Sequence, residues 1–322
     1  MVTKRVFNRI GVFFITLLLS TFLLFTLIRL APGDPVKMLL GTPETSDIYS
    51  DSYQKRYEEK RHELYLYESI PKQYLRWGKN LLDLNLGKSI YSNQAVTKEL
   101  SEKLPATIAL TIPAIGIQLL LGIILGVVSA LNANKWLDNW IRLFCSIISS
   151  LPGFSISLML IYLFAVKFGS YEISTAANFS RLWLPAIALG VISSPGFIRF
   201  VRSSMLEEMG KLYVANDLGL GKKSSVIIFG ILNNISLQII TVTATTFANL
   251  IGGSVVIESV FSWPGIGKYA MDSILMLDYP VIQGYGLLMV ILVITINTLV
   301  DFVYILFDPQ IKQGRERRRD FS

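Results

Sequence analysis

Residues 205–234 read MLEEMGKLYVANDLGLGKKSSVIIFGILNN and form a polar interval between two strongly apolar segments. A connector between two membrane-spanning helices needs only a handful of residues, whereas this one contains helix-forming residues and a Gly-Leu-Gly break followed by two lysines. A loop of this composition predicts a surface that docks onto another molecule.

The composition indicates a membrane protein with several spans. The chain has 322 residues, of which 52% are hydrophobic and only 16% are charged. Soluble domains carry about 25% charged residues. The mean hydropathy of +0.50 points the same way.

Metal and nucleophilic-triad chemistry lack their usual residues in this sequence. The single cysteine, Cys145, lies inside an apolar run and is expected to be a small buried side chain. The single histidine, His62, lies in a charged stretch and is expected on the surface. We therefore expect no metal and no catalytic residues in this chain.

Six segments are long and apolar enough to cross a bilayer, since a helix needs roughly 20 apolar residues to span about 30 Å of hydrocarbon. They lie at about 7–30, 106–131, 143–166, 182–200, 235–256 and 284–307. The sequence thus predicts an all-α integral membrane protein with six transmembrane helices. An even number of spans places both termini on the same side.

The net charge of +7 is concentrated on one predicted face. Four groups of basic residues precede span one, separate spans two and three, fill the interval between spans four and five, and end the chain: Lys4, Arg5, Arg9; Lys135, Arg142; Arg199, Arg202, Lys211, Lys222, Lys223; Lys312, Arg315, Arg317, Arg318, Arg319. The positive-inside rule assigns this face, with both termini, to the cytoplasm. Topology accounts for the basic excess, so we expect a lipid bilayer and no nucleic acid as partner.

The spans divide the chain into four parts. Residues 1–30 are a tail and the first transmembrane helix, and residues 31–104 are a small extracytoplasmic cap. Residues 105–310 form a five-helix transmembrane core that includes the cytoplasmic loop 202–234. Residues 311–322 are a basic cytoplasmic tail.

Small residues and prolines mark the spans where helices approach closely or bend: Pro113, Gly116, Gly122, Gly126, Pro152, Gly153, Pro185, Pro195 and Gly196. Glycines let helix backbones approach each other in lipid. A Pro-Gly break at 152–153 predicts an interruption of the third span, which either permits bending or only serves packing.

Spans five and six are unusually polar and suggest a translocation pathway lined by Thr241, Thr245, Asn249, Glu258 and Asn297. The threonines can bond back to their own helix, but Asn249 is expected to face protein or water. Asp301 lies four residues after Asn297, and its alternative role is structural pairing, with Arg199 or Arg202 as a partner.

Three glycine patterns fail as nucleotide sites. The sequence GIGKYA at 265–270 follows SWP and no strand, so it lacks the context of a dinucleotide fingerprint. The sequences GKK at 221–223 and GKS at 87–89 lack the earlier glycine of a phosphate loop. If ATP and Mg²⁺ are used, another chain must bind them.

Several ordered patches resemble one family of transport proteins. They read RLAPGDPV at 29–36, QYLRW at 73–77, LNLGKS at 84–89, LPATIALT at 104–111, GGSVVIESVFSWPGIGKYAMDSI at 252–274, DYPVIQG at 278–284 and LVDFVYILFDPQIK at 299–312. Together they span almost the whole chain. The chain resembles the inner-membrane permeases of binding-protein-dependent ABC importers, in the oligopeptide, dipeptide and nickel permease family.

This resemblance implies a type I ABC importer permease fold with a cytoplasmic coupling helix. It also implies a second homologous permease subunit, two cytoplasmic ABC ATPase subunits that bind ATP and Mg²⁺, and an extracytoplasmic solute-binding protein. The implied ATPase-coupling loop contains Tyr213, Ala215, Asp217, Gly219, Leu220 and Gly221, and the implied periplasmic gate region contains Trp263, Pro264, Gly265 and Gly267.

The register of the coupling loop has two solutions. Aligned on Gly219, Ala215 matches the last alanine of the family motif, while Asp217 replaces a second alanine and the spacing from Tyr213 is short. Aligned on Gly221, the spacing from Tyr213 agrees with the family motif, but the spacing to the asparagine further along the motif does not. Gly219 is our choice, with Gly221 as the alternative.

The function that follows is ATP-driven import of peptides. Nickel, metal chelates and glutathione-like solutes are alternatives, because the separate binding protein selects the solute. A stand-alone secondary transporter or channel would need no docking loop. A membrane-embedded enzyme would need a base that these spans do not offer.

Overall fold

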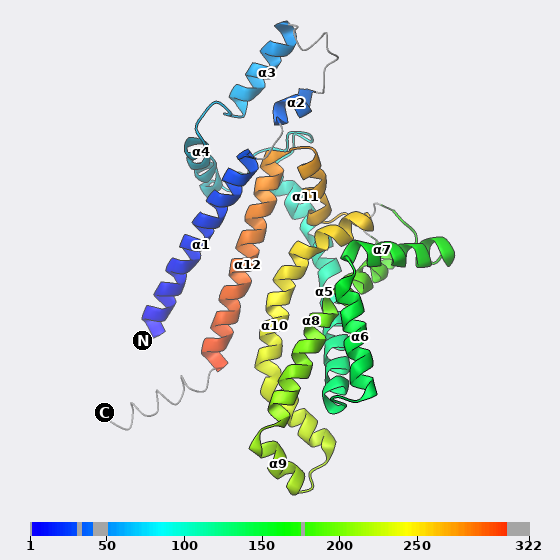
Figure 1. Cartoon of the computed structure of the whole chain (residues 1–322). Helices are drawn as coiled ribbons and strands as arrows, with labels where there is room; N and C mark the ends of the chain where they lie inside the picture. The colour runs from blue at the N-terminus through cyan, green and yellow to red at the C-terminus, as the bar shows by residue number, and fades with distance from the viewer. Residues whose placement is uncertain (1, 31–33, 41–50, 175–177, 308–322) are drawn as a thin grey trace, which may run out of the picture. The chain divides into compact units, whose positions relative to one another are not determined.

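The chain is all-helical in the computed structural model, which describes residues 2–30, 34–40, 51–174 and 178–307 (Figure 1). Within these ranges the only strand-like pairing is an isolated bridge between Lys88 and Ala95. In hydrocarbon every backbone polar group must be satisfied internally, which a helix does for itself. The helices are α1 (Val2–Leu30), α2 (Pro35–Leu40), α3 (Asp51–Glu63), α4 (Ile70–Leu82), α5 (Val96–Leu131), α6 (Trp136–Ser150), α7 (Gly153–Ile161), α8 (Trp183–Met209), α9 (Leu212–Gly219), α10 (Ser224–Val260), α11 (Ile266–Leu275) and α12 (Tyr279–Phe307), with a π-helix η1 (Tyr162–Lys167) and a 3₁₀ turn η2 (Phe179–Arg181).

Five of the described helices are long and apolar enough to span a membrane: Gly11–Leu30 of α1, α5, α8, α10 and Tyr279–Val300 of α12. The predicted third span, 143–166, is a bent pair in which α6 and the α7–η1 segment meet at 97°. The count of spans is six if this pair crosses as one broken span and five if it is a re-entrant loop.

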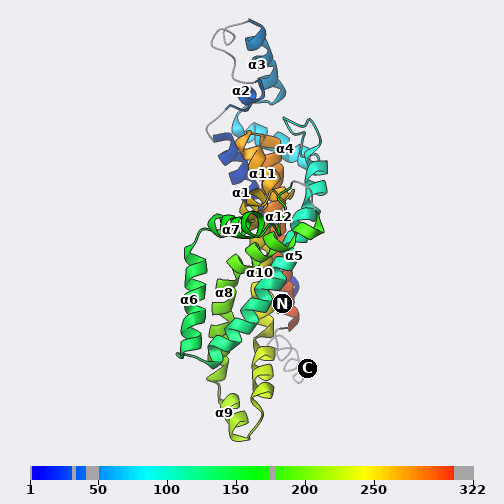
Figure 2. The ribbon, with the colours of Figure 1, turned by 90° about the vertical axis from the view of Figure 1, so that its right-hand side faces the viewer.

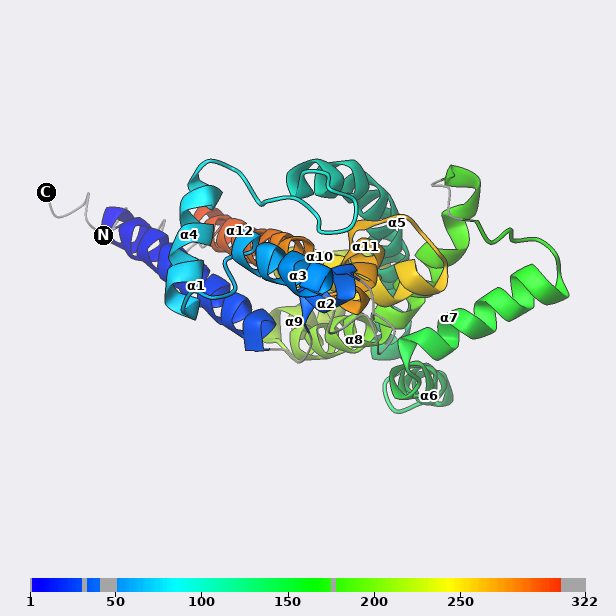
Figure 3. The same cartoon turned by 90° about the horizontal axis from the view of Figure 1, so that it is seen from above.

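The bend between α6 and α7 lies at the predicted Pro-Gly interruption, which is confirmed. Leu151 and Pro152 both adopt extended backbone angles, with ψ of 135° and 137°. Proline disfavours a helical conformation in the residue before it and lacks the N–H that a continuous helix would need. Figure 3 shows the result, with α6 seen along its axis and α7 running across the view.

The chain falls into two compact units. The first comprises 1–107 with 264–294, and the second comprises 108–263 with 295–322.

In the first unit, the segment before α5 is tied to α11 and to the start of α12. The buried Asp278 accepts hydrogen bonds from Ser89 Oγ at 2.6 Å and from the backbone N–H of Ile90 at 3.2 Å. Thr107 Oγ1 accepts from the N–H of Ile266 at 2.9 Å. These bonds fix the backbone around α11.

In the second unit, α8 packs against α6, α7 and α10. Two of the predicted glycines allow α5 to approach α8 closely. A Cβ added to Gly122 would lie 2.1 Å from the ring of Phe197, and one added to Gly126 would lie 2.7 Å from Val201 Cβ. Gly116 has no such constraint, since a Cβ there meets nothing within 4 Å.

Candidate functional site

The polar interval that opened the sequence contains a separate short helix, α9, between α8 and α10 (Figures 1 and 2). Lys211 is extended, with φ of −79° and ψ of 149°, and separates α9 from α8. At the other end Gly221 has a φ of +71°, which glycine adopts at little cost. The chain therefore makes two sharp turns around an eight-residue helix.

The inner side of α9 is held by apolar packing. Val214 is 3% exposed and belongs to one core cluster with side chains from α5, α8 and α10: Ala130, Phe197, Val201, Met205, Ile227, Ile231 and Ile235. Isolated helices of eight residues are not stable in water. The position of α9 thus depends on this cluster and on polar contacts beside it.

Those polar contacts converge on Glu208, and we name Glu208, Lys211, Tyr213 and Asn234 the Glu208 anchor. The buried Glu208 carboxylate, on α8, accepts hydrogen bonds from Tyr213 Oη of α9 at 3.0 Å and from Asn234 Nδ2 of α10 at 3.1 Å. Lys211 Nζ donates to the other oxygen at 2.5 Å. The anchor therefore connects all three helices.

Two pKa shifts follow from this arrangement. The hydrogen bond to Glu208 raises the pKa of Lys211 above its ordinary value. Burial raises the pKa of the Tyr213 phenol. Both groups thus remain protonated donors to Glu208 at neutral pH.

Three leucines in α9 and directly after it are exposed, and we name them the leucine face. Leu212, Leu218 and Leu220 are 77%, 61% and 77% exposed. Ala215 and Gly219 are exposed beside them, and nothing lies within 4 Å of a Cβ added to Gly219. Grouped exposed apolar side chains on a small helix indicate a partner that covers them.

Asp217 has a local role in the same loop. Its carboxylate lies 2.6 Å from Lys222 Nζ, and its carbonyl accepts from the N–H of Lys222 at 3.1 Å. Both contacts stabilise the turn at Gly221.

The residues predicted to line a pathway fall into two environments on α10 and α12. Thr241 and Thr245 donate to the carbonyls of Leu237 and Thr241 at 2.8 and 3.0 Å, as helix-internal bonds. Thr245, Asn249 and, on α12, Asn297 are exposed on the surface of the chain. Glu258 differs, because it is completely buried and accepts from Ser254 Oγ at 2.9 Å.

The predicted gate residues are mostly buried. Trp263 is 2% exposed, and its backbone N–H donates to the carbonyl of Glu258 at 2.8 Å. Gly265 and Gly267 are buried, Pro264 is half-buried, and these three belong to the first unit. Gly265 is the residue before the first turn of α11.

The sequence reasoning did not identify Glu208, Lys211 or Asn234 as one site. The available signal was an acid in the polar interval, three residues before a lysine. It also considered Arg199 and Arg202 as partners of Asp301, whose side chain lies outside the described residues. In the structure Arg202 binds Asp138 and Arg199 donates to Ser149.

Cys145 is 1% exposed, as predicted for a small core side chain. Among the described residues, no group of three or more His, Cys, Asp or Glu side chains is placed to hold a metal ion.

Residues 122–313 match the family described as binding-protein-dependent transport system inner membrane component. The chain belongs to this family. It is therefore a permease-type membrane component, and the recognition made from the motifs is confirmed.

Three relatives share most of their length with this chain. A probable peptide ABC transporter permease of Sinorhizobium fredii is 34% identical over 298 residues, which is 90% of this chain and 93% of the relative. A glutathione transport system permease of Pectobacterium atrosepticum is 31% identical, covering 92% and 95%. A di/tripeptide transport system permease of Pseudomonas aeruginosa is 32% identical, covering 96% and 98%.

A solved structure of the MetNI methionine ABC transporter, in an inward-facing conformation, shares the fold. It superposes with a TM-score of 0.53 at 18% identity, over 64% of this chain and 95% of the matched chain.

Proposed function

We propose that this chain is one of two homologous permease subunits of an ATP-driven importer of peptides. An extracytoplasmic binding protein delivers the solute, and two cytoplasmic ATPase subunits, which bind ATP and Mg²⁺, drive its passage. The family supports the importer class. The relatives named for peptide, di/tripeptide and glutathione transport support the solute class.

The observation that carries the proposal is the two-sided construction of α9. Its inner side is fixed to α8 and α10 by Val214 and the Glu208 anchor, while its leucine face is exposed. Burying one such leucine contributes about 1.5–3 kcal/mol. The leucine face is therefore suited to a groove on an ATPase subunit, as the family resemblance implies for this loop.

The mechanism follows from these attachments. Closure of the ATPase dimer on ATP moves α9, and the Glu208 anchor transmits the displacement to both α8 and α10. In α10, Thr241, Thr245 and Asn249 follow Ser224 by 17, 21 and 25 positions. At 1.5 Å per residue, a tilt at the start of α10 acts on these side chains about 26 to 38 Å away.

The orientation is part of the proposal. The α5–α6 turn and α9 lie at the same end of the second unit (Figures 1 and 2). Basic residues predicted to be cytoplasmic accompany both: Lys135 in the turn, and Lys211, Lys222 and Lys223 on either side of α9. This arrangement supports the assignment of α9 to the cytoplasm by the positive-inside rule. Both termini are assigned to the same side by the sequence; the basic tail 311–322 lies outside the described residues.

The experiment compares Leu218→Asp with Leu218→Met in the complete membrane complex. A carboxylate on the leucine face is expected to stop copurification of the ATPase subunits and to abolish transport, while membrane insertion is unchanged. Methionine keeps the volume and the apolar character, so Leu218→Met is the matched control. Normal transport by Leu218→Asp, with the ATPase still bound, would contradict the docking role.

The solute is tested separately through the binding protein. Mass spectrometry of the ligand that copurifies with it is expected to find short peptides. If the copurified ligand is instead a nickel chelate, the transporter belongs to the same class but imports metal and not peptides.

A further inference from the structure

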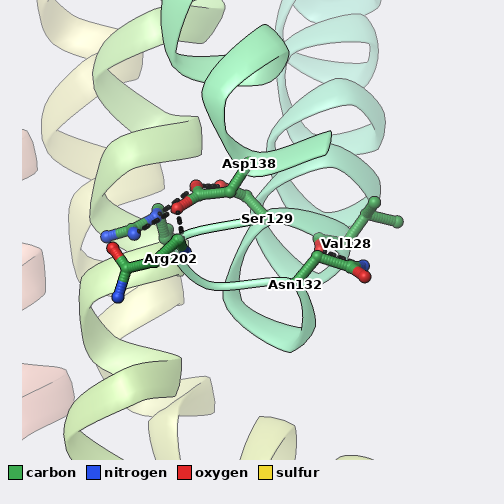
Figure 4. Close-up of polar contacts among 6 residues, drawn as sticks. Val128, Ser129, Asn132, Asp138 and Arg202 are labelled. Atoms are coloured by element: carbon green, nitrogen blue, oxygen red, sulfur yellow. Dashed lines mark hydrogen bonds and ion pairs between the residues drawn. The ribbon is translucent and has the colours of Figure 1, made fainter. Parts of the chain in front are cut away.

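The Asp138 carboxylate, near the start of α6, is completely buried and receives four hydrogen bonds (Figure 4). Arg202 of α8 binds both oxygens, with Nε 2.8 Å from Oδ1 and Nη2 2.7 Å from Oδ2. Ser129 of α5 donates its hydroxyl to Oδ1, and the backbone N–H of Asn134 lies 2.9 Å from Oδ2. One carboxylate thus joins α5, the turn after it, α6 and α8.

The geometry of this cluster makes it a stiff connection. Two parallel bonds from a guanidinium to a carboxylate fix orientation as well as distance. Asn134 has a φ of +62°, a conformation that asparagine tolerates better than most residues, and the turn thereby directs its N–H at the carboxylate. Sliding of α6 along α8 would break both bonds to Arg202 together.

Arg202 lies on the part of α8 that is attached to α9. It precedes Glu208 by six residues and Met209 by seven, which is about 10 Å along the helix axis. Its neighbours Val201 and Met205 belong to the core cluster that contains Val214 of α9. A displacement of α9 therefore reaches Arg202 through packed side chains.

A second side-chain hydrogen bond between α6 and α8 is exposed and involves a neutral acceptor. Arg199, one turn before Arg202, makes a single hydrogen bond from Nη2 to Ser149 Oγ at 3.0 Å on the exposed surface. A single exposed bond to a neutral hydroxyl contributes little restraint. The two arginines thus give a natural comparison on one helix.

We propose that Asp138 and Arg202 are positioning residues that carry the movement of α9 into α6, so that α6 moves with α8 as one body. This inference rests on the proposed function, since the movement is the one that the ATPase subunits impose. Loss of the pair would let α8 move while α6 lags behind it, and ATP would be hydrolysed with less transport.

The variants are chosen to avoid an unpaired buried charge. Arg202→Gln alone leaves the Asp138 carboxylate buried without its partner, which can prevent folding. The double variant Asp138→Asn with Arg202→Gln replaces the ion pair by two neutral amides of similar shape. Arg202→Lys keeps the charge without the two-pronged geometry, and Arg199→Gln is the matched control.

The measurement is the distance between spin labels on α6 and α8 in the complete complex. Cysteines replace the exposed residues Asn139 and Ser203, in a Cys145→Ala background. Pulsed EPR is recorded without nucleotide and after trapping with ATP and vanadate, and ATP hydrolysis is measured on the same samples.

We expect one distance in both states for the parent and for Arg199→Gln, and a shifted or broadened distribution in the trapped double variant. Arg202→Lys should give a smaller shift. Transport per ATP hydrolysed should fall about tenfold in the double variant, a common size for coupling between sites.

Two results would overturn the inference: a nucleotide-dependent distance in the parent, or an unchanged distance in the trapped double variant. A merely structural pair would lower thermal stability, hydrolysis and transport in proportion and leave the distance fixed. A parent complex that binds no ATPase subunit would overturn the proposed function and this inference together. If the parent complex hydrolyses ATP but the distances give either of the two results above, only the inference fails.

Discussion

Tyr213→Phe removes one hydroxyl from the Glu208 anchor and leaves the aromatic ring in place. The lost hydroxyl donates to Glu208 Oε1 at 3.0 Å and accepts from Asn234 Nδ2 at 3.1 Å. A hydrogen bond to a charged group contributes about 1.5–3 kcal/mol and a neutral one about 0.5–1.5 kcal/mol. Tyr213 is only half-buried, so the lower values apply and the expected loss is about 2 kcal/mol.

This loss acts on the local stability of α9. Because 1.4 kcal/mol corresponds to a factor of ten, about 2 kcal/mol raises the population of detached α9 about 30-fold. Hydrogen exchange read by mass spectrometry should show this increase for peptides covering 212–219, while peptides from the middle of α10 keep their rates.

The control is Tyr162→Phe, which makes the same chemical change on a ring that is 61% exposed on η1. It should leave exchange in α9 unchanged. Exchange in α9 that is equally slow in Tyr213→Phe and in the parent would refute the claim that the Glu208 anchor holds this helix.

Two further predictions concern backbone geometry. Gly126→Val should lower the thermal unfolding temperature of the detergent-purified chain, because the new side chain meets Val201 at a cost of about 1–3 kcal/mol. Gly116→Ala should leave this temperature unchanged, because the space around Gly116 is open. Equal effects of the two substitutions would contradict the close approach of α5 to α8. Gly221→Ala should slow transport through a strain of about 1–2 kcal/mol at its positive φ, whereas Gly219→Ala in the helix should be tolerated. This prediction departs from the choice of Gly219 made from the sequence, and the reverse order of transport rates would restore Gly219 as the required glycine.

The helical architecture could be predicted from the sequence because it depends on local properties. Runs of about 20 apolar residues identify membrane spans, however the helices pack against one another. The break at Pro152 agrees with the Pro-Gly pair in the sequence. Proline alone does not predict it, because Pro113 and Pro195 lie inside the uninterrupted helices α5 and α8. The 97° angle could not be predicted either, because it depends on how α7 packs against α8 and α10.

The polar contacts of the site could not be predicted, because they join residues far apart in the chain. Glu208 and Asn234 are separated by 26 positions, and Asp138 and Arg202 by 64. Their meeting depends on the crossing of α8 with α10 and with α6. A count of charges gives Arg202 several candidate acids, and the sequence suggests Asp301 only because an acid inside the hydrocarbon needs a partner.

The burial of Glu258 is also a feature that the sequence pattern did not predict. Its position on a polar face suggested a pathway residue, and that role stays a prediction. In the structure its side chain is completely buried beside Ser254, four residues earlier on the same helix. Helical periodicity places a residue on a face but does not say which face the rest of the fold covers.

The central claim, that α9 is seated on an ATPase subunit through its leucine face, is tested most directly by site-specific crosslinking in membrane vesicles that contain the complete transporter. Single cysteines replace Leu212, Leu218, Leu220 or Val214 in a Cys145→Ala background. The three exposed positions are expected to crosslink to the ATPase subunit, and the buried position 214 is not. Crosslinks from position 214, or none from any exposed position while the ATPase copurifies, would contradict the claim.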